Sequence, residues 1–180
     1  MTTTADDIRA VLDQTHDMEP VHGHVDVRIP AATLWEFFRQ AQLWPQWNRC
    51  FYRVRNADLV AGQRLVWAFQ PIRPVYLYKM PAIADIVQVE AGHQVAWHVT
   101  ALPGFFARHV YRLEDLGDGL TRFGSWEKAM GGGFRATRRF WLAHFLFVRD
   151  RSLEGARLLE QRYQETGRLD AADLPSRPLW

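Results

Sequence analysis

Apolar and polar residues alternate along two parts of the chain, at residues 22–29 and again from residue 51 to residue 129. This period of two is typical of strands that bury one face. The links at 60–62, 90–92 and 117–119 are short and rich in Gly and Asp, as tight antiparallel hairpins require. The pattern predicts one strand and then a meander of six, over 51–57, 63–70, 79–90, 93–101, 105–116 and 119–129.

Helical spacing of apolar residues marks the segments around these strands. Pro30 suits a helix start, which predicts a helix over 31–38, followed by a second short helix over 43–47. After three consecutive glycines, apolar residues share one stripe from Phe134 to Gly167, which predicts a long amphipathic helix. Thr4 and the acids after it can cap a further short helix over 6–15.

The chain has 180 residues, which is the length of one ordinary domain. We expect residues 1–19 to form a helical appendage, residues 20–167 to form the single domain and residues 168–180 to form an irregular tail. Aromatic residues make up 13% of the chain, and a small core rarely needs so many large rings. Something in the fold must therefore accommodate them.

Charge and cysteine content narrow the class of protein. The formal net charge of +2 is small for a protein whose partner is a polyanion, so we do not expect nucleic-acid binding. The lone Cys50 cannot form an intrachain disulfide, and the first residues lack the basic start and apolar stretch of a signal peptide. These features predict a cytoplasmic protein. The longest apolar run, 140–148, is much shorter than the roughly 20 residues that a transmembrane helix needs.

The order of these elements is that of the helix-grip fold, and residues 20–166 resemble the SRPBCC superfamily of START, Bet v 1-like and polyketide cyclase/dehydrase-like proteins. The segment 27–35 is similar to the first strand and helix of that superfamily, and Leu43-Trp44-Pro45-Gln46-Trp47-Asn48 is similar to the aromatic segment that follows. The later strands carry further matches, at 95–97, 103–106, His109, 119–123 and 127–131.

The resemblance implies an α+β fold in which a seven-stranded antiparallel curved sheet wraps around a long C-terminal helix. It also implies a cavity between sheet and helix, opening at Pro71–Tyr78, Leu102–Gly104 and Met130–Gly133. Strand alternation and the helical stripe place nine candidate ligand-binding residues around that cavity. They are Trp67, Phe69, Trp97, Val99, His109, Tyr111, Phe123, Trp141 and Phe145. The alternative is that these rings simply fill a solid core.

We therefore expect the protein to bind a hydrophobic small molecule, lipid-like or aromatic and polyketide-like, as a carrier or sensor without a cofactor. One alternative is an enzyme of the polyketide cyclase or dehydratase type, with His109, Tyr111 and Glu127 as candidate catalytic residues. His109 or Glu127 would remove a proton next to a carbonyl, and Tyr111 or an arginine would stabilise the enolate oxygen.

The apolar run at 140–148 supports a second alternative, because it is hydrophobic all round and its outer side needs a cover. That cover could be the chain itself, a second subunit in a homodimer, or transient contact with a membrane surface. A separate signal is His22, His24 and Asp26, which share one strand face at a spacing that metal ligands can adopt. Since the opposite face of that strand is apolar, we expect these three side chains to be solvated and to bind no metal.

Overall fold

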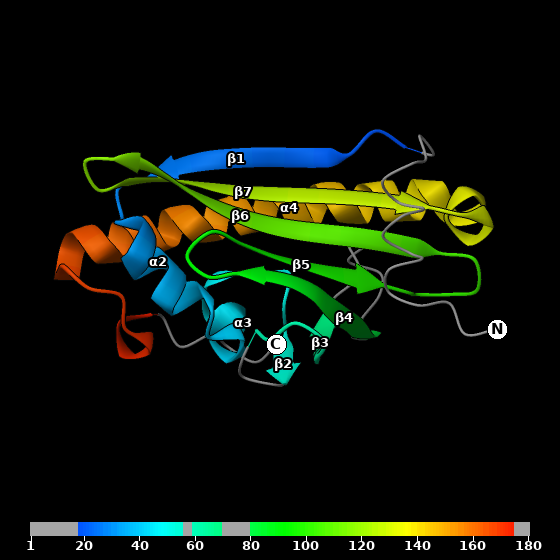
Figure 1. The fold of residues 1–180 in the computed structure, drawn as a ribbon, viewed down its shortest axis with the longest axis horizontal. Coiled ribbons are helices and arrows are strands. Elements are labelled where there is room, and N and C mark those ends of the chain that lie inside the picture. The colour runs from blue at the N-terminus through cyan, green and yellow to red at the C-terminus, as the bar shows by residue number, and fades with distance from the viewer. Residues whose placement is uncertain (1–17, 56–58, 70–79, 175–180) are drawn as a thin grey trace.

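The computed structural model describes residues 18–55, 59–69 and 80–174. Seven strands form one antiparallel sheet in the order β1-β7-β6-β5-β4-β3-β2 (Figure 1). The strands are β1 (Val21–Val27), β2 (Arg53–Arg55), β3 (Arg64–Phe69), β4 (Met80–Glu90), β5 (Gln94–Val99), β6 (Phe106–Gly117) and β7 (Leu120–Met130). The helices are α2 (Ala31–Phe38), η1 (Ala41–Leu43), α3 (Trp44–Trp47), α4 (Gly132–Thr166) and η2 (Ala171–Asp173).

This architecture confirms the predicted helix-grip fold, with a seven-stranded antiparallel sheet, a long C-terminal helix and short helices after the first strand. The first helix has the predicted bounds, whereas β2 is confined to three residues at the sheet edge. The helix predicted over 6–15 lies outside the described residues. In the region expected to be an irregular tail, the short helix η2 forms and Leu174 is buried.

The long helix α4 packs against the inner face of the sheet, mainly along β1 and β7, and lies behind these strands in Figure 1. It bends at Thr137, whose backbone angles are not helical and whose hydroxyl donates to the Gly133 carbonyl at 2.6 Å. Such a bond back to the preceding turn commonly bends a helix. The helix ends at Gly167, which adopts the left-handed conformation that glycine tolerates best.

The core divides into two clusters along the length of α4. The larger cluster holds the aromatic residues of α2 and α3, such as Phe38 and Trp44, against the inner face of the sheet. The smaller cluster lies at the N-terminal half of α4 and contains Phe105, Trp141 and Phe145. The larger cluster is densely packed, whereas residues of the smaller cluster border a cavity.

The apolar run of α4 at 140–148 is covered largely by the chain itself. Trp141, Phe145 and Val148 are buried against the rest of the protein, whereas Leu146 keeps 42% of its exposure. Homodimer formation and membrane contact stay predictions. Within the described residues, no helix is both long enough and apolar enough to span a membrane.

Candidate functional site

A cavity of about 290 Å³ lies between the inner face of the sheet and the N-terminal half of α4. Its walls come from β3, β4, the end of β5, the start of β6, one residue of β7, and α4. The lining residues are Trp67, Phe69, Met80, Pro81, Ala82, Ile83, Val99, Thr100, Ala101, Leu102, Phe105, Ala107, Glu127, Trp141, His144 and Phe145. Almost all of them are apolar, and the exceptions are Thr100, Glu127 and His144.

Two of the segments expected at the cavity opening pack directly against each other. The Gly133 amide donates to the Gly104 carbonyl at 2.9 Å. A Cβ atom at Gly131 would lie 2.2 Å from the Gly104 carbonyl oxygen, and one at Gly133 would lie 2.4 Å from the Pro103 carbonyl oxygen. Two of the three consecutive glycines are therefore required by close backbone approach. The third expected segment, Pro71–Tyr78, falls outside the described residues.

A carboxylate and an imidazole meet on the sheet side of the cavity. Glu127 on β7 lines the cavity, and its Oε2 lies 3.2 Å from Nδ1 of His109 on β6. The register of the two strands places these residues opposite each other. His109 is held by its neighbours, since its ring stacks on Trp97 at 4.7 Å and its Nε2 lies 3.4 Å from the Ser125 hydroxyl. Glu127 thus connects the cavity to a fixed imidazole.

His144 faces the same cavity from α4. Its ring packs 4.7 Å from that of Phe69 and 6.4 Å from that of Phe140. Burial lowers the pKa of His144 to about 4, although the charge of Glu127 acts in the opposite direction. His144 is therefore neutral near pH 7, with one ring nitrogen that donates and one that accepts hydrogen bonds.

Three buried polar atoms beside the cavity have no hydrogen-bond partner within the described part of the chain. They are Glu127 Oε2, His144 Nδ1 and Trp141 Nε1. The contact of Glu127 with His109 is short enough for an ion pair, but it does not have hydrogen-bond geometry. An unsatisfied buried polar group typically costs about 1–3 kcal/mol. A ligand that supplied the missing partners would recover part of that free energy.

The structure separates the nine predicted ligand-binding residues into two groups. Five of them line the cavity: Trp67, Phe69, Val99, Trp141 and Phe145. The other four are buried in the packed protein and are not among the lining residues: Trp97, His109, Tyr111 and Phe123. Of the candidate catalytic residues, Glu127 lines the cavity, His109 contacts Glu127, and Tyr111 is directed elsewhere.

Tyr111 belongs to a second polar cluster, among the aromatic rings of the larger core. Its hydroxyl lies 2.6 Å from the Ser152 hydroxyl of α4 and accepts from the Asn48 amide at 3.2 Å. Asn48 also donates to Ser152 at 3.1 Å and accepts from the Cys50 amide at the same distance. Burial raises the pKa of Tyr111 well above its ordinary value, so this phenol stays protonated.

His144, Phe105 and the partners of Tyr111 were not among the site residues predicted from the sequence. His144 did leave a signal, because it is the one strongly polar residue inside the apolar run 140–148. A polar side chain at such a position has to find a partner or line a cavity. Asn48 and Ser152 left none, because the residues of that cluster lie 63 and 41 positions from Tyr111 in the sequence.

The predicted histidine face of β1 carries no metal-binding geometry. His22 and His24 are exposed, and Asp26 accepts from Arg122 at 2.8 and 3.0 Å. Across the described ranges, no group of three or more His, Cys, Asp or Glu side chains is placed to hold a metal ion.

Neither protein-family models nor curated proteins match this sequence. Solved structures do match the fold. The Zhui aromatase/cyclase from a Streptomyces species has a TM-score of 0.66 at 13% identity, over 83% of this chain and 97% of the other. Norcoclaurine synthase from Thalictrum flavum, solved with dopamine and hydroxybenzaldehyde, has a TM-score of 0.53 at 12% identity, over 79% and 87%. The chain therefore has the helix-grip fold that its resemblance to the SRPBCC superfamily implied.

Proposed function

We propose that this protein binds a small aromatic molecule bearing a hydroxyl group in the cavity between the sheet and α4, as a carrier or sensor. The observation that carries the proposal is the placement of unsatisfied buried polar atoms of Glu127, His144 and Trp141 beside an otherwise apolar cavity. Small-molecule sites are commonly built in this way, with apolar walls that supply affinity and a few polar groups that fix orientation.

The cavity volume favours a compact ligand. Pockets that bind drug-sized molecules usually enclose about 300–1,000 Å³. At about 290 Å³, this cavity is just below that range and suits one or two rings better than a long-chain lipid or a polycyclic polyketide. The aromatic side chains of Phe69, Trp141 and Phe145 provide walls on which a flat ring can pack.

The polar atoms favour a hydroxyl over other groups. An ionised Glu127 accepts hydrogen bonds but donates none, so the ligand has to donate to it. The neutral His144 offers one donor or acceptor on the helix side. A hydroxyl satisfies both, because it donates one hydrogen bond and accepts others, whereas a ligand carboxylate would be repelled by Glu127. The dopamine and hydroxybenzaldehyde bound to norcoclaurine synthase are one-ring molecules of this kind and support the proposal.

The proposal is tested first by native mass spectrometry of the purified protein, with release and identification of any bound compound. A calorimetric titration then compares 2-naphthol with naphthalene. We expect 2-naphthol to bind at least tenfold more tightly than naphthalene, which corresponds to about 1.4 kcal/mol. Equal binding of naphthol and naphthalene would contradict the proposal, because the polar atoms would then play no part.

A pair of matched variants locates the binding site. Val99→Phe fills the cavity from β5, whereas Val66→Phe adds the same volume on the outer face of β3. We expect the first variant to lose naphthol binding and the second to keep it. If both variants bind as the wild type does, the ligand is not held in this cavity.

Proton transfer is a second candidate function, favoured by the contact between Glu127 and His109. Glu127 touches both the cavity and the imidazole. Its proposed role is to take a proton from a bound ligand, while His109 orients the carboxylate. The test is exchange of the α-protons of 2-tetralone with deuterated water, followed by NMR. An enzyme would lose exchange but keep binding in Glu127→Gln and His109→Ala, whereas a carrier would show no exchange above buffer.

A further inference from the structure

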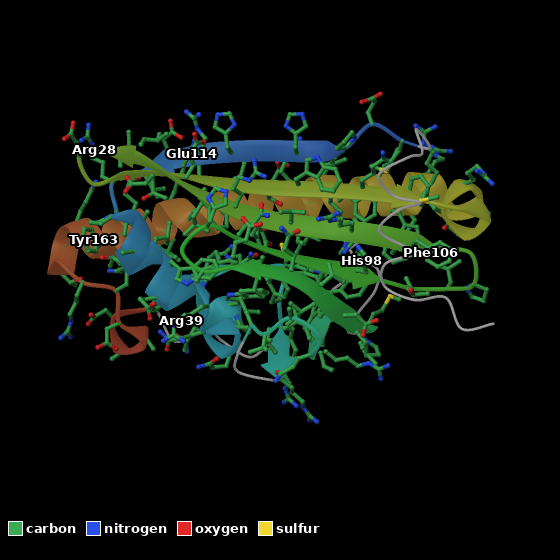
Figure 2. All side chains as sticks on the ribbon, viewed as in Figure 1. Arg28, Arg39, His98, Phe106, Glu114 and Tyr163 are labelled. Carbon is green, nitrogen blue, oxygen red and sulfur yellow. The ribbon has the colours of Figure 1, made fainter. Side chains whose placement is uncertain are left out.

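A second hollow lies on the outer face of the sheet, which is turned away from α4. It encloses about 680 Å³ and is lined by residues of β1, β4, β5, β6 and β7. We call it the outer groove; Glu114, labelled in Figure 2, belongs to its lining. Besides Glu114, its charged residues are Arg108, Arg112 and Arg122, so positive charge predominates. None of these residues belongs to the cavity on the inner face.

The strand register brings the central residues of the outer groove side by side. His24 on β1, Gly124 on β7 and Arg112 on β6 occupy one row across the sheet. In the next row, Trp126 on β7 lies beside Val110 on β6. The Arg112 guanidinium and the Trp126 indole ring therefore lie next to Gly124, which has no side chain.

Gly124 leaves space in the groove, although the backbone conformation at this position does not require glycine. Its φ is not in the left-handed region, and a Cβ atom there would come no closer than 3.8 Å to any neighbour. By contrast, a Cβ at Gly23 would lie 2.9 Å from the Arg149 side chain of α4, so packing explains that glycine. Glycine inside a strand costs roughly 0.5–1 kcal/mol and often marks a place where a ligand approaches closely.

Arg112 carries a charge that no carboxylate in the described part of the chain balances. Its Nε and one terminal nitrogen both donate to Oε1 of Gln94, at 3.3 and 3.1 Å, and none of the described acidic residues pairs with it. Arg122 differs, because Asp26 binds its guanidinium with two hydrogen bonds and Glu114 lies 4.0 Å away. The neutral Gln94 is buried and orients the Arg112 guanidinium while leaving its charge available.

We propose that the outer groove binds a small aromatic anion, whose ring packs over Gly124 against Trp126 and whose carboxylate or phosphate pairs with Arg112. Arginine presents a planar set of donors that matches both kinds of anion, and tryptophan offers the largest aromatic face for stacking. The lining has more arginines than carboxylates, which favours an anionic ligand over a cationic one. This site is independent of the inner cavity and of the function proposed for it.

The test is calorimetric titration of the full chain with two probes, 1-naphthoate for an aryl carboxylate and adenosine 5′-monophosphate for an aryl-bearing phosphate. Gly124→Val closes the groove, and Arg112→Gln removes the charge. Arg157→Gln, at an exposed arginine of α4, is the matched control for charge, and Val99→Phe is the control for the inner cavity. Thermal unfolding of each variant shows that it is folded.

We expect at least one probe to bind saturably and to lose affinity tenfold or more in both Gly124→Val and Arg112→Gln. Arg157→Gln and Val99→Phe should bind within twofold of the wild type, and raising the salt concentration should weaken binding. If only one probe binds, the result shows whether the groove prefers a carboxylate or a phosphate. The proposal is overturned if neither probe binds, if Arg112→Gln binds as the wild type does, or if only Val99→Phe loses binding.

Discussion

Two buried polar clusters, one in the densely packed core and one beside the cavity, differ in how far their hydrogen bonds are satisfied. In the first, Asn48, Tyr111 and Ser152 bond to one another at 2.6 to 3.2 Å. In the second, Glu127 and His144 each keep an atom that has no hydrogen-bond partner among the residues that the structure describes. A buried network whose hydrogen bonds are all made stabilises the fold. A buried polar atom without a hydrogen-bond partner destabilises the fold, and a ligand that supplies the partner can offset that loss. The contrast holds for these two clusters and not for the whole of each end, since Trp47 Nε1 in the larger core also has no hydrogen-bond partner among the described residues.

The largest expected effect comes from Asn48→Ala, which breaks the satisfied cluster at its centre. Asn48 donates to both hydroxyls and accepts from the Cys50 amide, so three hydrogen bonds are lost in a buried place. We expect the free energy of unfolding to fall by about 3 kcal/mol or more, measured by urea denaturation. Gln42→Ala, at an exposed position of η1, should change it by less than about 0.5 kcal/mol. If Asn48→Ala and Gln42→Ala lower the free energy of unfolding equally, the cluster has no structural role.

The next effect is the pH dependence that His144 adds to stability. Because burial lowers its pKa to about 4, the unfolded chain binds a proton between pH 6.5 and pH 4 that the folded chain does not bind. Stability should therefore fall as the pH drops through this window, by up to about 3 kcal/mol from this one group. Glu127 and His109 face His144 and act on its pKa in opposite directions.

His144→Phe isolates that contribution. Urea denaturation at several pH values should give a curve that is flatter for the variant than for the wild type between pH 6.5 and pH 4. Superimposable curves would mean that His144 is protonated equally in the folded and unfolded chains, and its neutral role beside the cavity would be withdrawn.

Tyr111→Phe should have a smaller effect, because the ring stays in place and only the hydroxyl is removed. Ser152 keeps its bonds to Asn48 and to the Val148 carbonyl. We expect a loss of about 1–2 kcal/mol in the free energy of unfolding and no change in naphthol affinity. Tyr163→Phe is the matched control, since this tyrosine is only half-buried on α4 (Figure 2). A large loss of ligand binding in Tyr111→Phe would place the hydroxyl at the binding site after all.

The sequence predicted the elements far better than it predicted the cavity. Strand alternation decides only which face a side chain occupies, and it placed Tyr111 and Trp67 correctly on the inner face. Whether an inward residue packs in the core or lines the cavity depends on where α4 lies. That position follows from close approaches, such as the one between Gly133 and Pro103, which involve residues from separate segments of the chain.

The outer groove was harder still to find from the sequence. Alternation placed Arg112 opposite the apolar residues of its strand, where a solvated surface is the ordinary expectation. It grouped Gly124 with Arg122 and Trp126, on a strand whose two faces are both mixed. The strand order β1-β7-β6 is what brings His24, Gly124 and Arg112 into one row. That order joins the first strand to the last, and no local pattern in the sequence shows such a pairing.

Glu127→Gln should change stability least and binding most clearly. An amide is close in size to the carboxylate but carries no charge, so the buried group costs less and the free energy of unfolding should stay equal or rise by up to about 1 kcal/mol. Naphthol affinity should fall about tenfold, because an amide oxygen is a weaker acceptor than a carboxylate. Glu114→Gln, on the outer face of β6, should leave both quantities unchanged. If Glu127→Gln instead lowers stability and keeps affinity, Glu127 belongs with the structural cluster, and the distinction between the two clusters fails.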